Sequence, residues 1–476
     1  MWLGRKDWVV MVVSEYRGVA VTVFGLGSFG GGVAAARFLA DCGARVTVTD
    51  LKSESELAES LGLLDGVNLA RLALGGHPED VLEGCELLVV NPAVRPDHPL
   101  VLHARARGLD VTTEIELFLR HQAGRVVAVT GSNGKSTTSA LLQGFLQCGA
   151  GSGRVWLGGN IGVSLLDRLD EIRATDWVVL ELSSFQLELL RQRRFRCESA
   201  ILTGFSPNHL DWHGTPEAYQ RAKYGIFAAQ HPTDISILPE ELSEDPRWRV
   251  RGRRHVFGLE DQGGDGACFS GSHLVLRTGD GWREDCVRLE LPQRLPGDHN
   301  RRNVAAAACA AWLAGADAEG FAGVVKSFQP LPHRLQCVAQ GGGLQFWNDS
   351  IATTPESAVA ALRHFSGRAI VLAGGYDKGQ DLSDLSAAIA EHAVGAVLMG
   401  QTAEQLRGQI ELRNSRSIGL AVATDFRNAF ELAVAMRDCG DIVLLSPGCA
   451  SYGWFRDFRE RGQQFEILAR EWSAEA

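Results

Sequence analysis

Short hydrophobic runs alternate along the chain with helix-length segments, a pattern typical of strand–helix–strand units. Residues 19–50 form the first unit: a strand, a glycine-rich turn, an alanine-rich helix and a second strand. Further strands are expected within residues 85–94 and 109–114, and the polar stretch 120–125 marks the end of this part. The pattern predicts a Rossmann-like first domain spanning residues 1–121.

A second series of units starts at residues 127–143, where a hydrophobic strand leads through a loop of small residues into a helix. Strands are expected at residues 176–182 and 198–205. The glycine- and aspartate-rich segment 258–284 is typical of hairpins or loops, and an alanine-rich helix follows it. We assign residues 122–328 to a central domain of the P-loop ATPase type with a mostly parallel sheet.

Two prolines near residues 327–335 break the chain, and a third series of strand–helix units follows. Its strands are expected within residues 344–349, 369–375, 393–400 and 441–448. We assign residues 329–476 to a second Rossmann-like domain. The sequence therefore predicts three α/β domains, without a repeat of solenoid period.

Composition narrows the possible classes of function. The chain has 476 residues, 45% of them hydrophobic and 22% charged, and no apolar run approaches the ~20 residues of a membrane span. The apolar run Trp8–Val13 is too short for the core of a signal peptide. A net charge of -10 disfavours nucleic-acid binding, and ten cysteines without a C-x-x-C pair disfavour a zinc site or a disulfide framework. We expect a cytoplasmic protein, in which the basic run 191–196 is a solvated helix face.

The turn of the first unit has the glycine spacing of a nucleotide-binding loop. Gly25, Gly27 and Gly30 satisfy G-x-G-x-x-G between a strand and a helix, and Asp50 follows 20 residues after the last of them. The motif favours a first domain that binds a nucleotide. The alternative is a tight turn without a ligand, because close packing of a helix on a strand also requires glycine.

The clearest candidate for chemistry is the loop within residues 127–143. The usual P-loop pattern is shortened here, since only Gly131 and Gly134 precede Lys135 and Ser136. Backbone N–H groups at the start of a helix bind an anion, a lysine adds a mobile charge, and a serine can ligate Mg²⁺. The loop therefore indicates a nucleoside triphosphate with Mg²⁺, the alternative being a bare glycine turn.

Polar side chains at the ends of two later strands are candidate metal ligands. Glu181 ends one strand and is followed by Ser183, at a place where P-loop enzymes carry a second Mg²⁺ ligand. A glutamate at a strand end is otherwise solvated. His209 follows the next strand, and its spacing leaves a ligand and a structural role equally open.

Lys223 lies in a helix that is predicted to begin at Pro216, with Thr215 as its N-cap. It stands two turns inside that helix. Propensity alone places such a lysine on the surface.

A series of motifs occurs in the order found in the Mur ligases, the ATP-dependent amino-acid-adding enzymes of peptidoglycan synthesis. These are TGSNGKSTTS, LGGNIG, ELSSFQLE, NHLDWHG with YQRAK, LPGDHNRRN, LPHRLQ, WNDSIATTP, GGYDKG and SPGCASYGWFRDFRERGQQF. The chain resembles this family over nearly its whole length. The last three motifs resemble its D-glutamate-adding branch.

The resemblance implies that the three domains bind, in order, the UDP end of UDP-N-acetylmuramoyl-L-alanine, ATP with Mg²⁺, and D-glutamate. The residues it places at the UDP substrate are Gly25, Gly27, Gly30, Asp50, Asn91, Asn160 and Ser183. Those at ATP are Gly131, Ser132, Asn133, Gly134, Lys135, Ser136, Thr137, Asn300, Asn303, Arg334 and Asp349. Those at D-glutamate are Thr353, Lys378, Ser451 and Phe458. The implied metal ligands are Ser136, Glu181, His209 and Lys223 as a carbamate, and the implied catalytic residues are Lys135, Glu181, His209 and Lys223.

The implied reaction is a ligation that yields ADP and phosphate. The alanyl carboxylate attacks the γ-phosphate of ATP and becomes an acyl phosphate, from which the amine of D-glutamate displaces phosphate. Because ATP and the amino acid arrive on different domains, closure of the third domain onto the second is expected to assemble the site. The expected partners are these small molecules alone, with no nucleic acid, no membrane span and a monomeric chain.

The chain departs from its relatives mainly in the first domain. Asn91 and Ala93 stand where many relatives have Ser-Pro-Gly, and Leu51 and Lys52 stand where a hydroxyl and an arginine are common. These differences leave the contacts of the uridine pocket unassigned. In the third domain, Ile351 replaces a lysine found in some relatives.

Three other functions compete with this interpretation. A nicotinamide dehydrogenase would explain the first glycine motif and Asp50, but it has no use for Lys135 and Glu181. A non-catalytic nucleotide sensor would explain the phosphate loop, but not the motifs WNDSIATTP and SPGCASYGWF. A folylpolyglutamate ligase shares the central ATP chemistry, but its first domain is not expected to be glycine-rich and UDP-binding.

Overall fold

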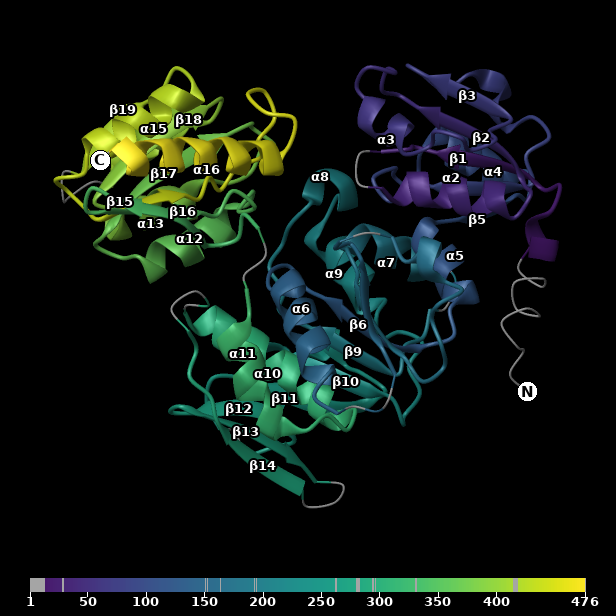
Figure 1. The fold of residues 1–476 in the computed structure, drawn as a ribbon, viewed down its shortest axis with the longest axis horizontal. Coiled ribbons are helices and arrows are strands. Elements are labelled where there is room, and N and C mark those ends of the chain that lie inside the picture. The colour runs from purple at the N-terminus through teal and green to yellow at the C-terminus, as the bar shows by residue number, and fades with distance from the viewer. Residues whose placement is uncertain are drawn as a thin grey trace. The chain divides into compact units, whose positions relative to one another are not determined.

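The computed structural model describes residues 13–475 except 28–29, 150, 152, 163, 192, 194, 262, 280–282, 293–294, 296, 330–331 and 414–417. The described strands form sheets of five, nine and six strands, and helices connect most successive parallel strands (Figure 1). The predicted α/β fold class is therefore confirmed. Within the described part of the chain, no helix combines the length and the apolar character needed to cross a membrane.

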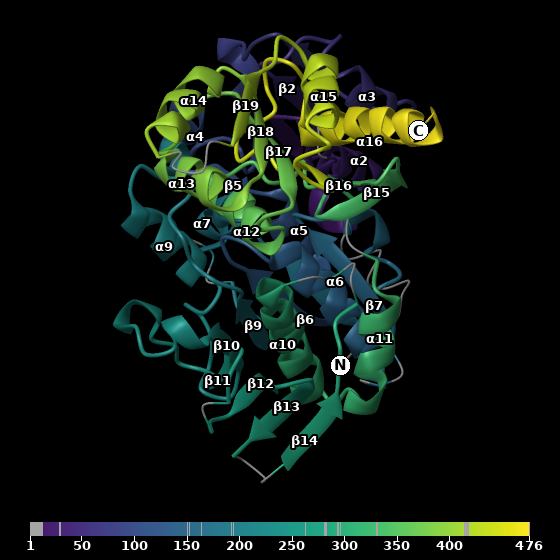
Figure 2. The ribbon, with the colours of Figure 1, turned by 90° about the vertical axis from the view of Figure 1, so that its left-hand side faces the viewer.

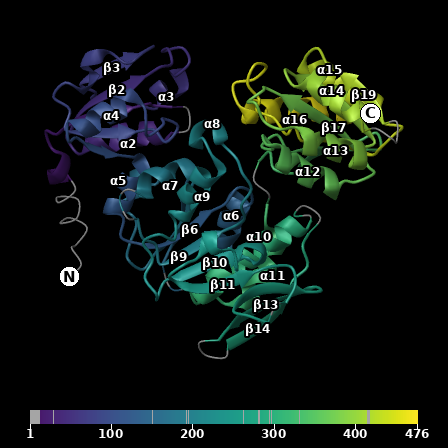
Figure 3. The same ribbon diagram turned by 180° about the vertical axis from the view of Figure 1, so that it is seen from behind.

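The first sheet has the order β3-β2-β1-β4-β5, and all its pairings are parallel, as in a Rossmann half. Its elements are β1 (Ala20–Phe24), α2 (Gly31–Asp41), β2 (Arg45–Asp50), α3 (Ala58–Gly62), β3 (Arg71–Leu74), η1 (Glu79–Leu82), β4 (Leu87–Val90), α4 (Pro99–Ala106), β5 (Asp110–Thr112) and α5 (Glu114–His121). Alternate residues of β1 face opposite sides. Val21 and Val23 pack in the cluster that contains residues of α2, whereas Phe24 packs with residues of α4. Figure 3 labels both helices beside the strands of this sheet.

The second sheet has the order β14-β13-β12-β11-β10-β9-β6-β8-β7. Strands β6 to β12 pair in parallel, and β12, β13 and β14 continue the sheet as antiparallel hairpins (Figure 2). The β12–β13 hairpin lies in the glycine-rich segment 258–284, for which hairpins or loops were predicted. The strands are β6 (Arg125–Thr130), β7 (Val155–Gly159), β8 (Trp177–Glu181), β9 (Ser199–Leu202), β10 (Ile235–Pro239), β11 (Arg253–Phe257), β12 (Gly266–Ser270), β13 (His273–Thr278) and β14 (Arg283–Arg288). The helices are α6 (Lys135–Leu146), η2 (Leu166–Arg168), α7 (Ser184–Arg191), α8 (Leu210–His213), α9 (Pro216–Tyr224), η3 (Glu240–Leu242), η4 (Pro246–Trp248), α10 (Asp298–Leu313), η5 (Ala318–Gly320) and α11 (Phe321–Ser327).

The third sheet has the order β15-β16-β20-β17-β18-β19, in which only the β15–β16 pair is antiparallel. Its elements are β15 (Gln336–Gly341), β16 (Leu344–Asn348), α12 (Pro355–His364), β17 (Ala369–Gly375), α13 (Ser383–His392), β18 (Gly395–Gly400), α14 (Ala403–Glu411), β19 (Gly419–Val422), α15 (Phe426–Ala435), β20 (Ile442–Leu445) and α16 (Phe458–Glu475). Helices cover both faces. Val371 of β17 packs with α12 and α13, while its neighbour Ile370 packs with α15 and α16.

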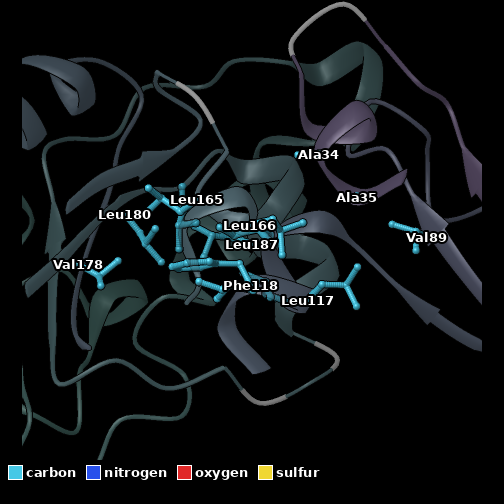
Figure 4. Close-up of a cluster of buried hydrophobic side chains, with 14 of the residues drawn as sticks. Ala34, Ala35, Val89, Leu117, Phe118, Leu165, Leu166, Val178, Leu180 and Leu187 are labelled. Carbon is cyan, nitrogen blue, oxygen red and sulfur yellow. The ribbon is translucent and has the colours of Figure 1, made fainter. Parts of the chain in front are cut away.

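The chain divides into two compact units. One contains residues up to Glu290 together with Arg301–Val325, and the other contains Leu291–Asn300 and Lys326–Ala476. In the first unit, one hydrophobic cluster joins the first two sheets, because Phe118 of α5 and Leu166 of η2 belong to it with residues of α2 and β8 (Figure 4).

Several strands were not predicted from the sequence, namely β3, β7, β10, β11, β14, β15 and β19. Five of these, β3, β7, β14, β15 and β19, are edge strands, which need fewer buried side chains and therefore show a weaker hydrophobic pattern.

The prediction that residues 191–196 form a solvated helix face is wrong. Helix α7 ends at Arg191, and the arginines beyond it form ion pairs with carboxylates. Arg193 pairs with Asp110, and Arg196 pairs with Asp234 at 2.7 Å. Residues 192 and 194 lie outside the described part.

Candidate active site

The predicted phosphate loop connects β6 to α6, and its glycines are required by close packing. Gly131 and Gly134 have φ angles of 153° and 83°, in the region that favours glycine. A Cβ atom on Gly131 would lie 1.9 Å from the Thr203 hydroxyl, and one on Gly134 would lie 2.4 Å from Oδ1 of Asn303. The structure thus brings Asn303 of α10 to the loop, as predicted, and adds Thr203, which the sequence did not indicate.

Two lysines converge on this loop. Nζ of Lys135 donates hydrogen bonds to the carbonyl oxygens of Gly131 and Ser132, both at 3.0 Å. Nζ of Lys223 donates to the same Gly131 oxygen at 2.7 Å. The two amino groups thus meet at one carbonyl oxygen beside the start of α6, where an anion is bound most readily.

Lys223 is 1% exposed, so its predicted surface position is wrong. Its helix does begin as predicted, since Oγ1 of Thr215 accepts a hydrogen bond from the Ala218 N–H group and a proline follows the cap. The side chain points inward one turn beyond buried Tyr219, and its Nζ lies 4.8 Å from the ring centroid of that tyrosine. Burial lowers the pKa of Lys223 well below its usual value, the charge of Lys135 lowers it further, and Glu181 opposes the shift.

Glu181 lies at the carboxyl end of β8, in register with Val129 of β6 and Gly159 of β7. Its side chain is buried, at 1% exposed. Oε1 accepts a hydrogen bond from Nδ2 of Asn160 at 3.0 Å, whereas Oε2 is buried and has no partner among the described residues. A buried carboxylate oxygen without a donor is costly unless a cation or a ligand supplies the missing interaction. Glu181 therefore fits the ligand role, and Asn160 lies beside it as predicted.

His209 is the N-cap residue of α8 and adopts a left-handed conformation with φ at 54°. Its ring centroid lies 4.9 Å from that of Phe185 and 6.3 Å from that of Tyr219. Within the described residues, no group of three or more histidine, cysteine, aspartate and glutamate side chains is arranged to hold a metal. A metal bound here would need other oxygen donors, such as a serine hydroxyl or the phosphates of a nucleotide.

Ser183 is engaged in a capping box at the start of α7. Its N–H and Oγ–H groups both donate to Oε1 of Gln186, and the Gln186 N–H group donates back to Oγ of Ser183 at 3.2 Å. The hydroxyl therefore has a structural role, and its predicted contact with the UDP substrate stays a prediction.

The glycine-rich turn of the first sheet is braced by Asn91 and Asp50. A Cβ atom on Gly25 would lie 2.9 Å from Cβ of Asn91, and one on Gly27 would lie 2.7 Å from Nδ2 of the same asparagine. Oδ2 of Asp50 accepts a hydrogen bond from the Gly27 N–H group at 3.0 Å, and Oδ1 accepts one from the Lys52 N–H group at 2.9 Å. Asp50 thus holds the turn through main-chain contacts. Gly30 caps α2 with φ at 84°.

In the second unit, three loops meet at the carboxyl ends of the adjacent strands β16, β20 and β17. The Gly448 N–H group donates to the Ala352 carbonyl oxygen at 2.9 Å, which joins the loop after β20 to the loop after β16. The Tyr376 N–H group donates to the Ala450 carbonyl oxygen at 2.8 Å, which joins the loop after β17 to the loop after β20. The predicted residues Thr353, Lys378 and Ser451 therefore belong to one cluster of strand-end loops, where ligands of such sheets bind.

Asp349 follows β16 and is buried, and half-buried Arg334 lies near enough for its charge to act on that carboxyl group. Oδ2 of Asp349 accepts a hydrogen bond from the Ser446 hydroxyl at 2.7 Å, and Oδ1 accepts one from the Leu335 N–H group at 3.2 Å. Burial raises the pKa of Asp349 to about 7, although these hydrogen bonds and the charge of Arg334 oppose the shift. Nε of Arg334 is buried and has no partner among the described residues, so it can donate to a ligand. Asn300 is also buried.

Arg461 of α16 is a residue of this region to which the sequence analysis gave no role. It is 1% exposed and donates to Oγ and the carbonyl oxygen of Ser350, at 3.0 and 2.8 Å, and to the Cys449 carbonyl oxygen at 3.1 Å. Oγ of Ser350 in turn donates to the carbonyl oxygen of Phe458 at 2.7 Å. Arg461 therefore fixes two of the converging loops, and its burial lowers the pKa of the guanidinium to about 9.

Three family models match successive parts of the chain. Residues 19–113 match the family model "Mur ligase MurD-like, N-terminal domain", residues 129–311 match "Mur ligase middle domain", and residues 333–449 match "Mur ligase, glutamate ligase domain". A UDP-N-acetylmuramoylalanine–D-glutamate ligase from Acidobacterium capsulatum is 36% identical over 458 residues, which cover 95% of this chain and 96% of that protein. The chain belongs to the Mur ligase family.

Other Mur ligases extend the comparison. The UDP-N-acetylmuramoylalanine–D-glutamate ligase of Roseiflexus is 37% identical over 473 residues, covering 96% of this chain and 100% of that protein. Among solved structures, UDP-N-acetylmuramate-alanine ligase MurC from Thermotoga maritima has a TM-score of 0.60 at 18% identity, covering 96% of this chain and 100% of that one. The MurF ligase of the same organism, in complex with ADP, has a TM-score of 0.55 at 17% identity, covering 98% and 99% of the two chains. At these identities the structural likeness shows a shared Mur ligase fold.

Proposed function

We propose that this chain is an ATP-dependent ligase that adds D-glutamate to UDP-N-acetylmuramoyl-L-alanine in peptidoglycan synthesis. Relatives with 36% and 37% identity over almost the whole chain carry the name of that activity. The observation that carries the proposal is the shortened phosphate loop, where Lys135 and buried Lys223 converge beside an unpaired oxygen of Glu181. A sensor that only binds a nucleotide would not need a second site for an amino acid, which we place at Lys378.

ATP binding is assigned to loop residues 131–137 and Asn303, together with Asn300, Arg334 and Asp349. Mg²⁺ fits the first part of this site, where Ser136, Glu181 and His209 would hold it. Lys223 would join them as a carbamate, because an ammonium would repel the ion, whereas a carbamate offers two oxygens to a hard cation. When bound, Mg²⁺ supplies positive charge at the phosphates.

The residues of the chain account for both steps of the reaction. Lys135 stabilises the negative charge that develops on the β- and γ-phosphates. An oxygen of the alanyl carboxylate bonds to the γ-phosphorus as the bond to ADP breaks, which gives an acyl phosphate. The amine of D-glutamate then attacks the carbonyl carbon and loses a proton, and phosphate leaves with the former carboxylate oxygen. Lys378, Thr353, Ser451 and Phe458 would orient the amino acid for this attack.

The UDP group of UDP-N-acetylmuramoyl-L-alanine is assigned to the turn of Gly25, Gly27 and Gly30 in the first sheet. Its alanyl carboxylate is assigned to a position near Asn160, which follows β7 of the second sheet. We further propose domains at residues 1–121, 122–328 and 329–476, a monomeric state and a cytoplasmic location. All ten cysteines are free thiols, as is usual for proteins of a reducing compartment.

The decisive experiment measures phosphate release with the UDP-muramoyl-alanine acceptor and each candidate amino acid. D-Glutamate should stimulate release, L-glutamate should not, and ¹⁸O in the alanyl carboxylate should appear in inorganic phosphate with ADP as the other product. Lys378→Ala should raise the KM for D-glutamate and leave that for ATP unchanged, with exposed Lys326→Ala as the control. Label in AMP, or tight binding of NAD in place of the UDP substrate, would refute the proposal.

A further inference from the structure

Lys378 lies against an aromatic ring from a different loop. Its Nζ lies 5.5 Å from the centroid of the Tyr452 ring, within the range of a cation–π contact. The loop of Lys378 follows β17, and that of Tyr452 follows β20. Tyr452 is 50% exposed, and its ring meets that of Tyr376 edge to face at 5.8 Å between centroids.

The main chain fixes this arrangement. Tyr376, two residues before Lys378, is bridged to Ala450, two residues before Tyr452. One position earlier, a Cβ atom on Gly375 would lie 2.3 Å from the Ala450 carbonyl oxygen, so the two loops touch at their backbones. Because this main-chain pairing holds both loops, it limits the distance between the Tyr452 ring and the Lys378 ammonium.

Lys378 forms no ion pair with any carboxylate among the residues that the structure describes. Within the part of the chain that the structure describes, no carboxylate lies within 4.0 Å of its Nζ. The aromatic face is therefore the one favourable contact that the described residues give this ammonium. A ring attracts a cation without accepting its N–H donors in the strong way a carboxylate does, so the donors stay available.

We propose that Tyr452 is a positioning residue for Lys378, holding the ammonium over its ring so that it meets a carboxylate of the incoming amino acid. The inference rests on the proposed function, in which Lys378 binds that amino acid. A free lysine loses rotamer entropy when it binds, and part of this loss is avoided when the side chain is already held in place. Tyr452 acts on amino-acid affinity through Lys378 and has no part in the chemical steps.

The test compares amino-acid kinetics in four variants. An exposed cation–π contact contributes about 0.5–1 kcal/mol, which corresponds to a change of about two- to five-fold. Tyr452→Leu should therefore raise the KM for D-glutamate by about two- to five-fold with kcat nearly unchanged. Tyr452→Phe and Tyr452→Trp keep a ring and should keep the KM near the parent value. Trp454→Leu is the matched control, since Trp454 is exposed on the same loop, and it should leave the KM unchanged.

A double-mutant cycle separates this role from a general loosening of the loop. In a Lys378→Met background, Tyr452→Leu should have no further effect on the KM for D-glutamate. Additive effects, an equal change in Trp454→Leu, or an equal loss in Tyr452→Phe would each overturn the inference. If Lys378→Met itself leaves the KM unchanged, the assignment of the amino-acid pocket fails. If Lys378→Met raises the KM and Tyr452→Leu does not, only the role of Tyr452 fails.

Discussion

Replacement of Lys223 by alanine tests the carbamate most directly. A lysine with an ordinary pKa of about 10.4 is neutral in roughly one molecule in a thousand at pH 7.4, and each unit of lowering raises that fraction about tenfold. Burial and the nearby Lys135 lower the pKa of Lys223 well below the usual value. Only a neutral amine attacks CO₂, forming an N–C bond and releasing one proton. The environment of Lys223 therefore favours the modification that the proposed chemistry requires.

The expected loss can be bounded from the contacts of Lys223. The variant loses the 2.7 Å hydrogen bond to Gly131 and, where the lysine is carbamylated, the two charged oxygens that the carbamate would offer to a cation. Interactions of charged groups of this kind contribute about 1.5–3 kcal/mol, so Lys223→Ala should lower kcat/KM for ATP by at least about 10- to 150-fold.

The assay is amino-acid-dependent ADP release, with Lys326→Ala as the control at an exposed lysine. Added formate or acetate should partly restore the Lys223→Ala enzyme. With ¹³C-bicarbonate, the parent protein should show a carbamate signal that the variant lacks, and this signal should weaken as the pH falls and the amine becomes protonated. Full activity of Lys223→Ala, or a carbamate signal that persists in it, would refute the reasoning.

Three other changes give distinct expectations. Glu181→Gln keeps the oxygen that Asn160 contacts but removes the charge, so Mg²⁺-dependent ADP release should be lost with little change in Tm; a normal Mg²⁺ titration would contradict the metal assignment. Because the pKa of Asp349 is raised to about 7, the folded protein keeps a proton that the unfolded chain releases above about pH 4. The free energy of unfolding should therefore fall by about 1.4 kcal/mol for each unit that the pH rises between about pH 4 and 7. Asp349→Asn should remove this part of the pH dependence in thermal unfolding. Gly134→Ala adds a clash with Asn303 to the strain of a positive φ, so it should weaken ATP binding and lower Tm. Gly315→Ala is the control, because φ is also positive there but a Cβ atom would meet no atom within 4 Å, and its effect should be smaller. Equal effects of the two changes would argue against the contact with Asn303.

The sequence predicted those elements and loops whose determining residues lie close together along the chain. The phosphate loop is an example, because its strand, glycines, lysine and helix lie within residues 127–143 and the structure places each as expected. The N-cap at Thr215 is another, since a cap depends on a hydroxyl three residues before the N–H group that it binds.

Features that depend on tertiary packing were missed or wrongly predicted. Propensity placed Lys223 on the surface, but the carbonyl of Gly131, 92 positions earlier in the chain, receives its hydrogen bond in the interior. The role of Arg461 was missed for the same reason, because its acceptors at Ser350 and Cys449 come from two other loops. The spacing of Asp50 did not indicate its structural role, in which it accepts hydrogen bonds from the N–H groups of Gly27, in the turn after β1, and of Lys52; its predicted place at the UDP substrate stays a prediction.

The order of strands in the third sheet constrains when this part of the protein can fold during synthesis. Strand β20 (Ile442–Leu445) lies between β16 and β17, but it is made only after β17, β18 and β19, so the middle of the sheet stays incomplete until then. Arg461 comes still later, on α16. The loops of the proposed amino-acid site can therefore come together only after β20 and α16 have left the ribosome, whereas β6 and α6 of the phosphate loop emerge much earlier. A chain cut before β20 would contain the phosphate loop but lack the loops of the proposed amino-acid site.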